Sequence, residues 1–123
     1  VISADQDAET WVIDHPDRAL TRRIIAFYVE QRFADGWTGR RLRGMFLRAA
    51  LRDVDSRAIV TMDTSAESYA FKIAIDRART AAKAGWISES ELAGWVGALE
   101  AEAAAGRFFS SLNFYVESGV VPP

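Results

Sequence analysis

The segment that most constrains the fold is the last one, residues 107–119. From Phe108 onward, one set of alternate positions reads Phe, Ser, Leu, Phe, Val, and the other reads Phe, Ser, Asn, Tyr, Glu. Side chains alternate across a strand, so this pattern predicts a strand with one apolar and one mixed face. Because its backbone N–H and C=O groups need partners, the strand must pair with earlier parts of the chain.

Composition sets the broad class. The 123 residues are half hydrophobic and 26% charged, which is typical of one globular domain. There are no cysteines, which excludes disulfides, thiolate metal sites and a cysteine nucleophile. The net charge of -2 gives no basic field for nucleic acid. No apolar run reaches the roughly 18 residues that a membrane helix needs, and no signal peptide is visible, so we expect a cytoplasmic protein without membrane contact.

The first half of the chain predicts a short strand end followed by two helices. Residues 1–4 resemble the end of a buried strand, 5–9 an acidic loop, and 10–13 a short apolar run. Asp14, Pro16 and their neighbours suit a helix start, and the apolar stripe predicts a helix over 16–34. Thr38 is the expected cap of a second helix over 39–51.

The second half predicts a strand, two helices and the closing strand. Residues 54–62 alternate in polarity and are expected to form a half-buried strand. A capping-box pattern at 64–67 predicts a helix to about residue 84, where Gly85 ends it. A second capping box at 88–91 predicts a helix to about residue 105, ended by Gly106.

Three stretches resemble a known family. They are WVIDHPDRALTRR at 11–23, FADGWTGRRL at 33–42 and AGRFFSSL at 105–112. Together they resemble the C-terminal half of a class I S-adenosylmethionine-dependent methyltransferase of the ubiquinone/menaquinone-biosynthesis-like group. The resemblance covers essentially the whole chain but only about half of such an enzyme. It therefore implies one domain, the substrate-side half of the fold, with the cofactor-binding half absent.

The resemblance implies a specific arrangement of these elements. Residues 1–4 would end the fifth strand of the family sheet, 54–62 would be the sixth, and 108–117 the seventh. The seventh strand of that fold runs antiparallel between the fifth and sixth. The expected fold is α/β, a Rossmann-like half with a small mixed sheet of about three strands and about four helices. The helices over 65–105 would be an insertion that covers the substrate.

The implied activity is transfer of a methyl group to a small molecule, with S-adenosylmethionine as the cofactor of the complete enzyme. The family's glycine-rich loop and its ribose-binding acid have no counterpart here. The pairs Gly36/Gly39 and Gly94/Gly97 follow no predicted strand, so we expect no cofactor to bind this chain alone. The alternative is a non-catalytic assembly module that forms a homodimer through an exposed sheet edge next to residues 1–4.

His15 is the candidate catalytic residue. It is the only histidine, and it follows a predicted strand end, where an imidazole can act as a base on a substrate hydroxyl. The alternative is a local hydrogen bond at a helix start. Trp37, Arg40 and Arg41 are candidates for substrate binding, because arginine holds anions and tryptophan stacks on rings. The alternative is a turn tryptophan beside solvated arginines.

Four further aromatic residues are candidates for lining a substrate pocket: Tyr28, Phe33, Phe108 and Tyr115. They also fit plain core positions. The five arginines within 40–52 form a basic strip that could touch phosphates, but the acidic flanking loops and the absence of interleaved exposed aromatics favour a solvated helix face. We find no spacing typical of metal ligands and no paired carboxylates, and we expect neither a metal nor a nucleic-acid partner.

Overall fold

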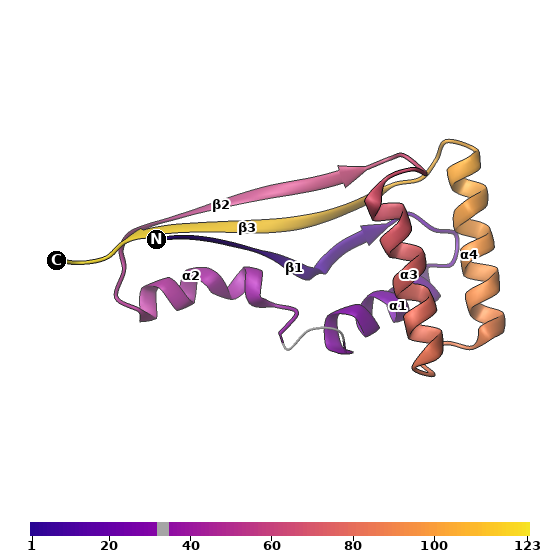
Figure 1. The fold of residues 1–123 in the computed structure, drawn as a ribbon, viewed down its shortest axis with the longest axis horizontal. Helices are drawn as coiled ribbons and strands as arrows, with labels where there is room; N and C mark the ends of the chain where they lie inside the picture. Colours follow the sequence, from indigo (N-terminus) through magenta and orange to yellow (C-terminus); the bar gives the residue numbers. More distant parts are fainter. Residues whose placement is uncertain (32–34) are drawn as a thin grey trace.

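The computed structural model describes residues 1–31 and 35–123, and in this part of the chain it has a mixed α/β architecture (Figure 1). The chain forms four helices and a three-stranded sheet within these residues. The elements follow in the order β1 (Ile2–Ile13), α1 (Arg18–Gln31), α2 (Thr38–Arg48), β2 (Arg52–Asp63), α3 (Tyr69–Lys83), α4 (Glu89–Ala104) and β3 (Ser110–Val120).

The closing strand β3 is the centre of the sheet. The strand order is β1-β3-β2, and β3 is antiparallel to both neighbours. Ser110 pairs with Ile13 on one side and with Asp63 on the other. The expected central, antiparallel position of the last strand is therefore confirmed. The sheet is antiparallel at both of its pairings rather than mixed, and β1 and β2 point in the same direction.

The strand β1 is much longer than predicted. The acidic segment 5–9, expected as a loop, belongs to the strand Ile2–Ile13. Its pairing shifts between Asp7 and Val12, where five steps along β1 match two steps along β3. Thr10 holds this bulge, because its hydroxyl donates to the Asp7 carbonyl and accepts from the Asn113 N–H. The odd number of extra residues exchanges the two faces of the strand after the bulge.

Two of the predicted helix starts are wrong. Thr38 does not cap α2: it is the first helical residue, and Trp37 precedes it without a side-chain cap bond. The capping box at 64–67 does not form, because α3 starts four residues later than that pattern implies, with the Ser68 hydroxyl accepting from the Phe71 N–H. At the start of α1, Asp17 caps the helix by accepting from the Leu20 N–H at 3.0 Å.

The predicted start of α4 and the predicted ends of α3 and α4 are confirmed, whereas α1 starts at Arg18 instead of residue 16 and α2 ends at Arg48 instead of residue 51. Ser88 and Glu91 form a complete capping box at the start of α4. Gly85 and Gly106 follow α3 and α4 with φ of 81° and 75°, the left-handed conformation that suits glycine after a helix.

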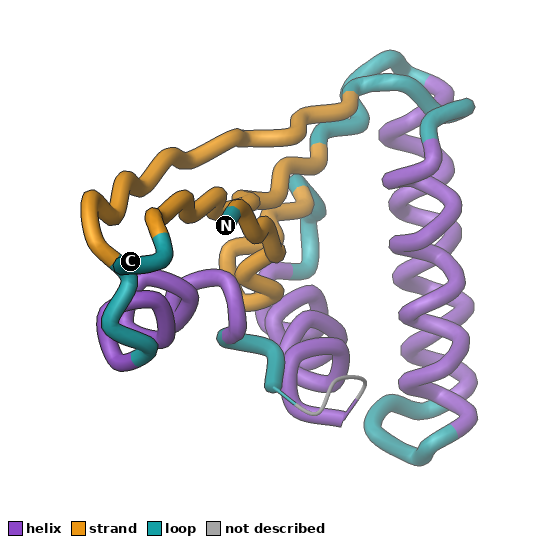
Figure 2. The backbone as a smooth tube through the Cα atoms, turned by 60° about the vertical axis from the view of Figure 1, so that its left-hand side comes forward, coloured by secondary structure: helices purple, strands orange, loops and turns teal. Residues whose placement is uncertain are grey.

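The molecule has a helical end and a sheet end (Figures 1 and 2). At the helical end, α1, α3 and α4 pack on the end of β1 and the start of β3 and enclose a buried hydrophobic core cluster. At the sheet end, α2 packs on one face, where Phe46 of the helix and Leu51 just after it lie against Gly119 of β3. The strand predicted over 54–62 forms as β2, but the prediction that it is half-buried is wrong, because its side chains are exposed along almost its whole length. The core cluster at the helical end includes Trp11, Ile24, Phe27, Ala74, Ala78, Trp95, Leu99 and Phe108.

Candidate functional site

A hollow lies where the sheet meets the helical end. A cavity of about 470 Å³ is bounded by the ends of β1 and β2, the start of β3, and helices α1 and α3. It opens on the sheet face that carries Gln6 and Phe114, a directly opposed pair. Asp7, the neighbour of Gln6, points to the other face, where α2 lies. The β1 bulge is therefore what returns Trp11 to the cavity face.

Hydrogen-bonded aromatic rings form the β1 side of the cavity. The indole N–H of the buried Trp11 donates to the Ser110 hydroxyl at 3.0 Å. The Tyr28 hydroxyl accepts from the Gln6 amide at 3.1 Å. The two rings meet edge to face, with centroids 4.9 Å apart. These contacts fix a mainly apolar wall with a few polar groups, as is common in small-molecule sites.

Arg77 forms the α3 side of the cavity, together with Ile73 one turn before it and Ala70 two turns before it. Its side chain is only 14% exposed, and its guanidinium carbon lies 5.2 Å from the centre of the Tyr28 ring. One terminal nitrogen reaches Asp76 at 3.1 Å. The Nε atom is buried and has no hydrogen-bond partner among the described residues. A buried donor left unpaired costs about 1–3 kcal/mol.

His15 lies outside this cavity and is fixed by structural contacts. The ring is buried and stacked on Trp95 with centroids 4.8 Å apart. Its Nδ1 accepts from the Asp17 N–H at 2.9 Å, so the proton of the neutral ring sits on Nε2 and donates to the Trp95 carbonyl at 2.9 Å. Both nitrogens are engaged, so this geometry gives His15 a role in joining β1 to α4 and does not favour the base expected from the sequence.

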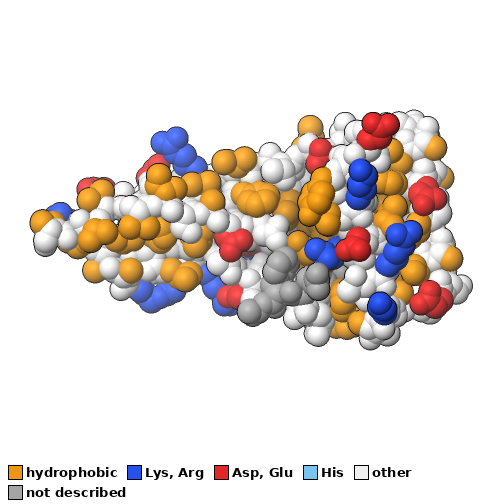
Figure 3. Space-filling view, in the orientation of Figure 1, with side chains coloured by type: hydrophobic (Ala, Val, Ile, Leu, Met, Phe, Trp, Pro, Cys, Tyr) orange, Lys and Arg blue, Asp and Glu red, His pale blue; other side chains and the backbone are white. Residues whose placement is uncertain are grey.

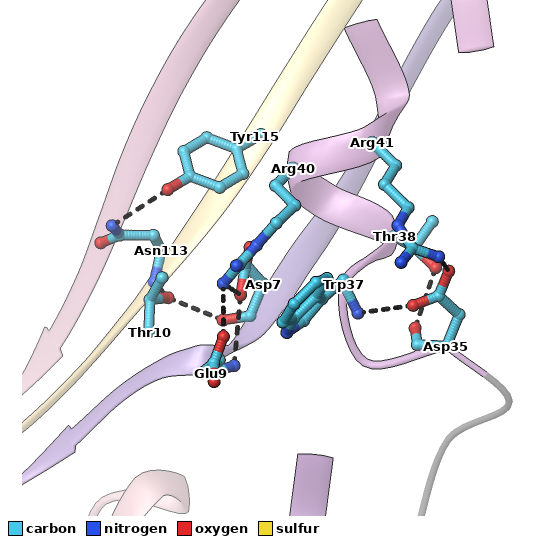
Figure 4. A network of polar contacts seen from close by, with 10 residues as sticks. All are labelled: Asp7, Glu9, Thr10, Asp35, Trp37, Thr38, Arg40, Arg41, Asn113 and Tyr115. Carbon is cyan, nitrogen blue, oxygen red and sulfur yellow. Dashed lines mark hydrogen bonds and ion pairs between the residues drawn. The ribbon is translucent and has the colours of Figure 1, made fainter. Parts of the chain in front are cut away.

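Arg40 and Trp37 form a separate network between α2 and β1 (Figure 4). Two guanidinium nitrogens of Arg40 bond the carboxylate of Asp7, which is 1% exposed, and one also reaches Glu9 at 2.9 Å. The guanidinium lies over the Trp37 ring, 4.3 Å from its centre. The hydrogen bonds that Arg40 donates to Asp7, together with the negative charges of Asp7 and Glu9, raise the pKa of Arg40. Arg41 pairs with Asp35 at 2.5 Å nearby.

Of the described residues predicted to bind substrate, only Tyr28 lines the cavity. Phe108 is 2% exposed and meets Phe71 edge to face, which makes it a core residue. Tyr115 lies on β3, on the face opposite the cavity, and its hydroxyl contacts the Asn113 amide at 3.4 Å. Phe33 lies outside the described residues.

The sequence interpretation missed Trp11, Ser110 and Arg77 as cavity residues. Trp11 and Ser110 lie in two of the stretches that carry the family resemblance, but they are 99 positions apart and only the β1–β3 register joins them. For Arg77 a signal was available, because the residue continues the Ala70 and Ile73 stripe of α3 where an apolar side chain is expected.

The basic strip on α2 is partly neutralised by the protein itself. Besides the ion pairs of Arg40 and Arg41, Arg43 donates to the Ser56 hydroxyl, which in turn donates to Glu117. These contacts favour docking of α2 on the sheet over binding of phosphates.

No protein-family model matches this chain, and no curated protein matches it. Within residues 1–31 and 35–123, no helix combines the length and apolar character needed to cross a membrane. The same residues contain no cluster of three or more His, Cys, Asp and Glu side chains that could hold a metal ion.

Proposed function

We propose that this chain is the C-terminal, substrate-side portion of an S-adenosylmethionine-dependent methyltransferase, and that its cavity holds a small-molecule methyl acceptor. Two observations support the proposal. The three sequence stretches resemble that family, and the strand order β1-β3-β2 with a reversed β3 is the order that the resemblance implies.

The position of the cavity carries the proposal furthest. β1 and β2 point the same way, and both end at the cavity, where β3 begins. Ligands of open α/β sheets bind outside the carboxyl ends of such strands. An acceptor in this cavity would lie at the edge of the sheet where a neighbouring cofactor-binding half would present its methyl group.

The described residues do not themselves fit the cofactor. Gly94 and Gly97 lie inside α4, and Gly39 lies inside α2 against the backbone of β1. None of these glycines forms a loop between a strand and a helix that could cradle a nucleoside. We therefore derive no step through the cofactor from these residues. The role of this chain is to bind the acceptor, exclude water from it and hold its reacting atom in position.

The test compares the complete gene product with this chain. Isothermal titration should show S-adenosylmethionine binding to the complete product and none to residues 1–123. Ala70→Trp, which fills the cavity from α3, should abolish transfer of labelled methyl groups to small acceptors while cofactor binding persists. Ala93→Trp, on the exposed side of α4, is the matched control and should keep both.

Two results would refute the proposal. One-to-one cofactor binding by the isolated chain would show that the cofactor half is not a separate segment. A complete product that neither binds the cofactor nor transfers its methyl group would exclude methyl transfer as the function.

Self-association through the sheet is a second candidate, favoured by the apolar side chains left uncovered at the sheet end (Figure 3). Ile2, Ile59 and Val120 are exposed by 77%, 54% and 51%. Within the described residues, the sheet ends at β1 on one side and at β2 on the other. Light scattering should then report a homodimer that Ile2→Lys dissociates, whereas a monomer at all concentrations would exclude it.

A further inference from the structure

We propose that the ligand of the cavity is a planar carboxylic acid and that Arg77 is the residue that binds its carboxylate. The inference rests on the proposed function, because the same cavity would hold the methyl acceptor. It adds the chemical class of that acceptor and names the side chain that selects it.

The guanidinium of Arg77 offers one side to a ligand. Its Nη1 is bonded to Asp76, while Nε has no hydrogen-bond partner among the described residues. The Nε–H and one Nη2–H point outward in parallel from the same edge of the planar guanidinium, and two parallel N–H groups match the two oxygens of a carboxylate. The ring of Tyr28 supports the plane from one face at 5.2 Å, which limits how it can tilt.

Arg77 is free to reach the cavity. Its present ion pair is with Asp76, whose side chain is 61% exposed, so water can replace that contact at little cost. Nε is closed to water in the present rotamer. A modest turn of the guanidinium toward the cavity would therefore exchange a buried, unpaired donor for a charge-assisted pair with the ligand.

The remaining walls indicate a planar body. Trp11, Tyr28 and Phe114 present aromatic surface to a cavity of about 470 Å³, a volume that suits a small organic ligand. Asp63, at the end of β2, is the carboxylate that also lines it. This charge repels an acid group, so the ligand's carboxylate belongs on the α3 side and a hydroxyl or amine belongs near Asp63.

Isothermal titration of the chain without any methyl donor tests the inference with two probes. We expect 6-hydroxy-2-naphthoate to bind at least tenfold more tightly than the neutral 6-hydroxy-2-naphthamide. Arg77→Gln should remove this difference, and Asp63→Asn should increase it. Arg79→Gln removes an exposed charge from the same helix and should leave the difference unchanged.

A second variant keeps the test decisive if Arg77→Gln does not fold. Arg77→Lys retains the charge without the paired donors and should weaken naphthoate binding several-fold while the cooperative thermal transition persists. Equal binding of the two probes, binding of neither, or an unchanged preference in a folded Arg77→Gln or Arg77→Lys variant would overturn the inference. Because no methyl donor is present, each of these outcomes is separate from the methyl-transfer test.

Discussion

Replacing Arg40 with alanine should destabilise the protein far more than its surface position suggests. Its partner Asp7 is 1% exposed, and the carboxylate would lose both guanidinium bonds while keeping the 3.2 Å contact from the Glu9 N–H. Leaving a buried charge without its partner costs about 3–5 kcal/mol. The Arg40 side chain is 38% exposed, so water would enter after its removal. We therefore expect Arg40→Ala to lower the free energy of unfolding by about 3 kcal/mol, the lower end of that range.

Removing the other partner of this ion pair, Asp7, should lower the free energy of unfolding by less. Asp7→Ala leaves a guanidinium that still reaches Glu9 and water, so we expect a loss of about 1–2 kcal/mol. Urea unfolding followed by circular dichroism measures both values, together with the double variant. The double variant should be more stable than the sum of the single losses predicts, with a coupling of about 1–3 kcal/mol.

Arg41 provides a matched control on the same helix. The side chains of Arg41 and its partner Asp35 are 52% and 39% exposed, so Arg41→Ala should lower the free energy of unfolding by less than about 1 kcal/mol. If Arg40→Ala and Arg41→Ala unfold at the same urea concentration, the Asp7 contact does not fasten α2 to β1. Additive losses in the double variant would lead to the same conclusion.

Two other predictions concern helix geometry and pH. A Cβ on Gly39 would lie 2.7 Å from the β1 backbone, so Gly39→Ala should lower the free energy of unfolding by about 1–3 kcal/mol. Gly97 lies on the open side of α4, so Gly97→Ala should be neutral or stabilising. Thermal unfolding measures both variants. Hydrogen bonding to the Ser88 N–H, and then to Arg23, lowers the pKa of Glu91. The stability from that contact is present above the ordinary glutamate pKa of about 4.3 and is lost as pH falls through the lowered value. The melting temperature of Glu91→Gln should therefore lie below wild type at pH 7 and approach it at pH 3, and a constant gap would contradict the cause.

Local patterns predicted the elements whose signals are local. The alternation of β3, the capping box of α4 and the glycines after α3 and α4 each act within a few residues, and the structure contains all of them. The competing cap signals at 38 and 64–67 failed because Trp37 and Ser68 start the helices instead. Residues that can cap a helix are common, so a sequence often offers several neighbouring candidates for one helix start. The backbone direction of the segment that precedes the helix decides which candidate caps it.

The first strand could not be predicted because its acidic residues have distant partners. Asp5, Asp7 and Glu9 read as a loop along the sequence, yet Asp7 is buried by Arg40, 33 positions away. The cavity escaped prediction for the same reason. It needs the β1–β3 register, the bulge at Thr10 and the approach of α3, none of which leaves a periodic signal in one segment.

The bulge in β1 connects the two halves of the molecule. Before it, Asp7 faces α2 and Gln6 faces the cavity; after it, Trp11 faces the cavity and Val12 is 49% exposed. A strand without the bulge would keep the same alternation and turn Trp11 toward the α2 face, away from Ser110 and Tyr28. The Arg40 contact to Asp7 fixes β1 before the bulge, and the Thr10 contact to Asn113 fixes the bulge itself. Weakening either contact should therefore loosen the aromatic wall of the cavity, although neither Arg40 nor Thr10 lines it.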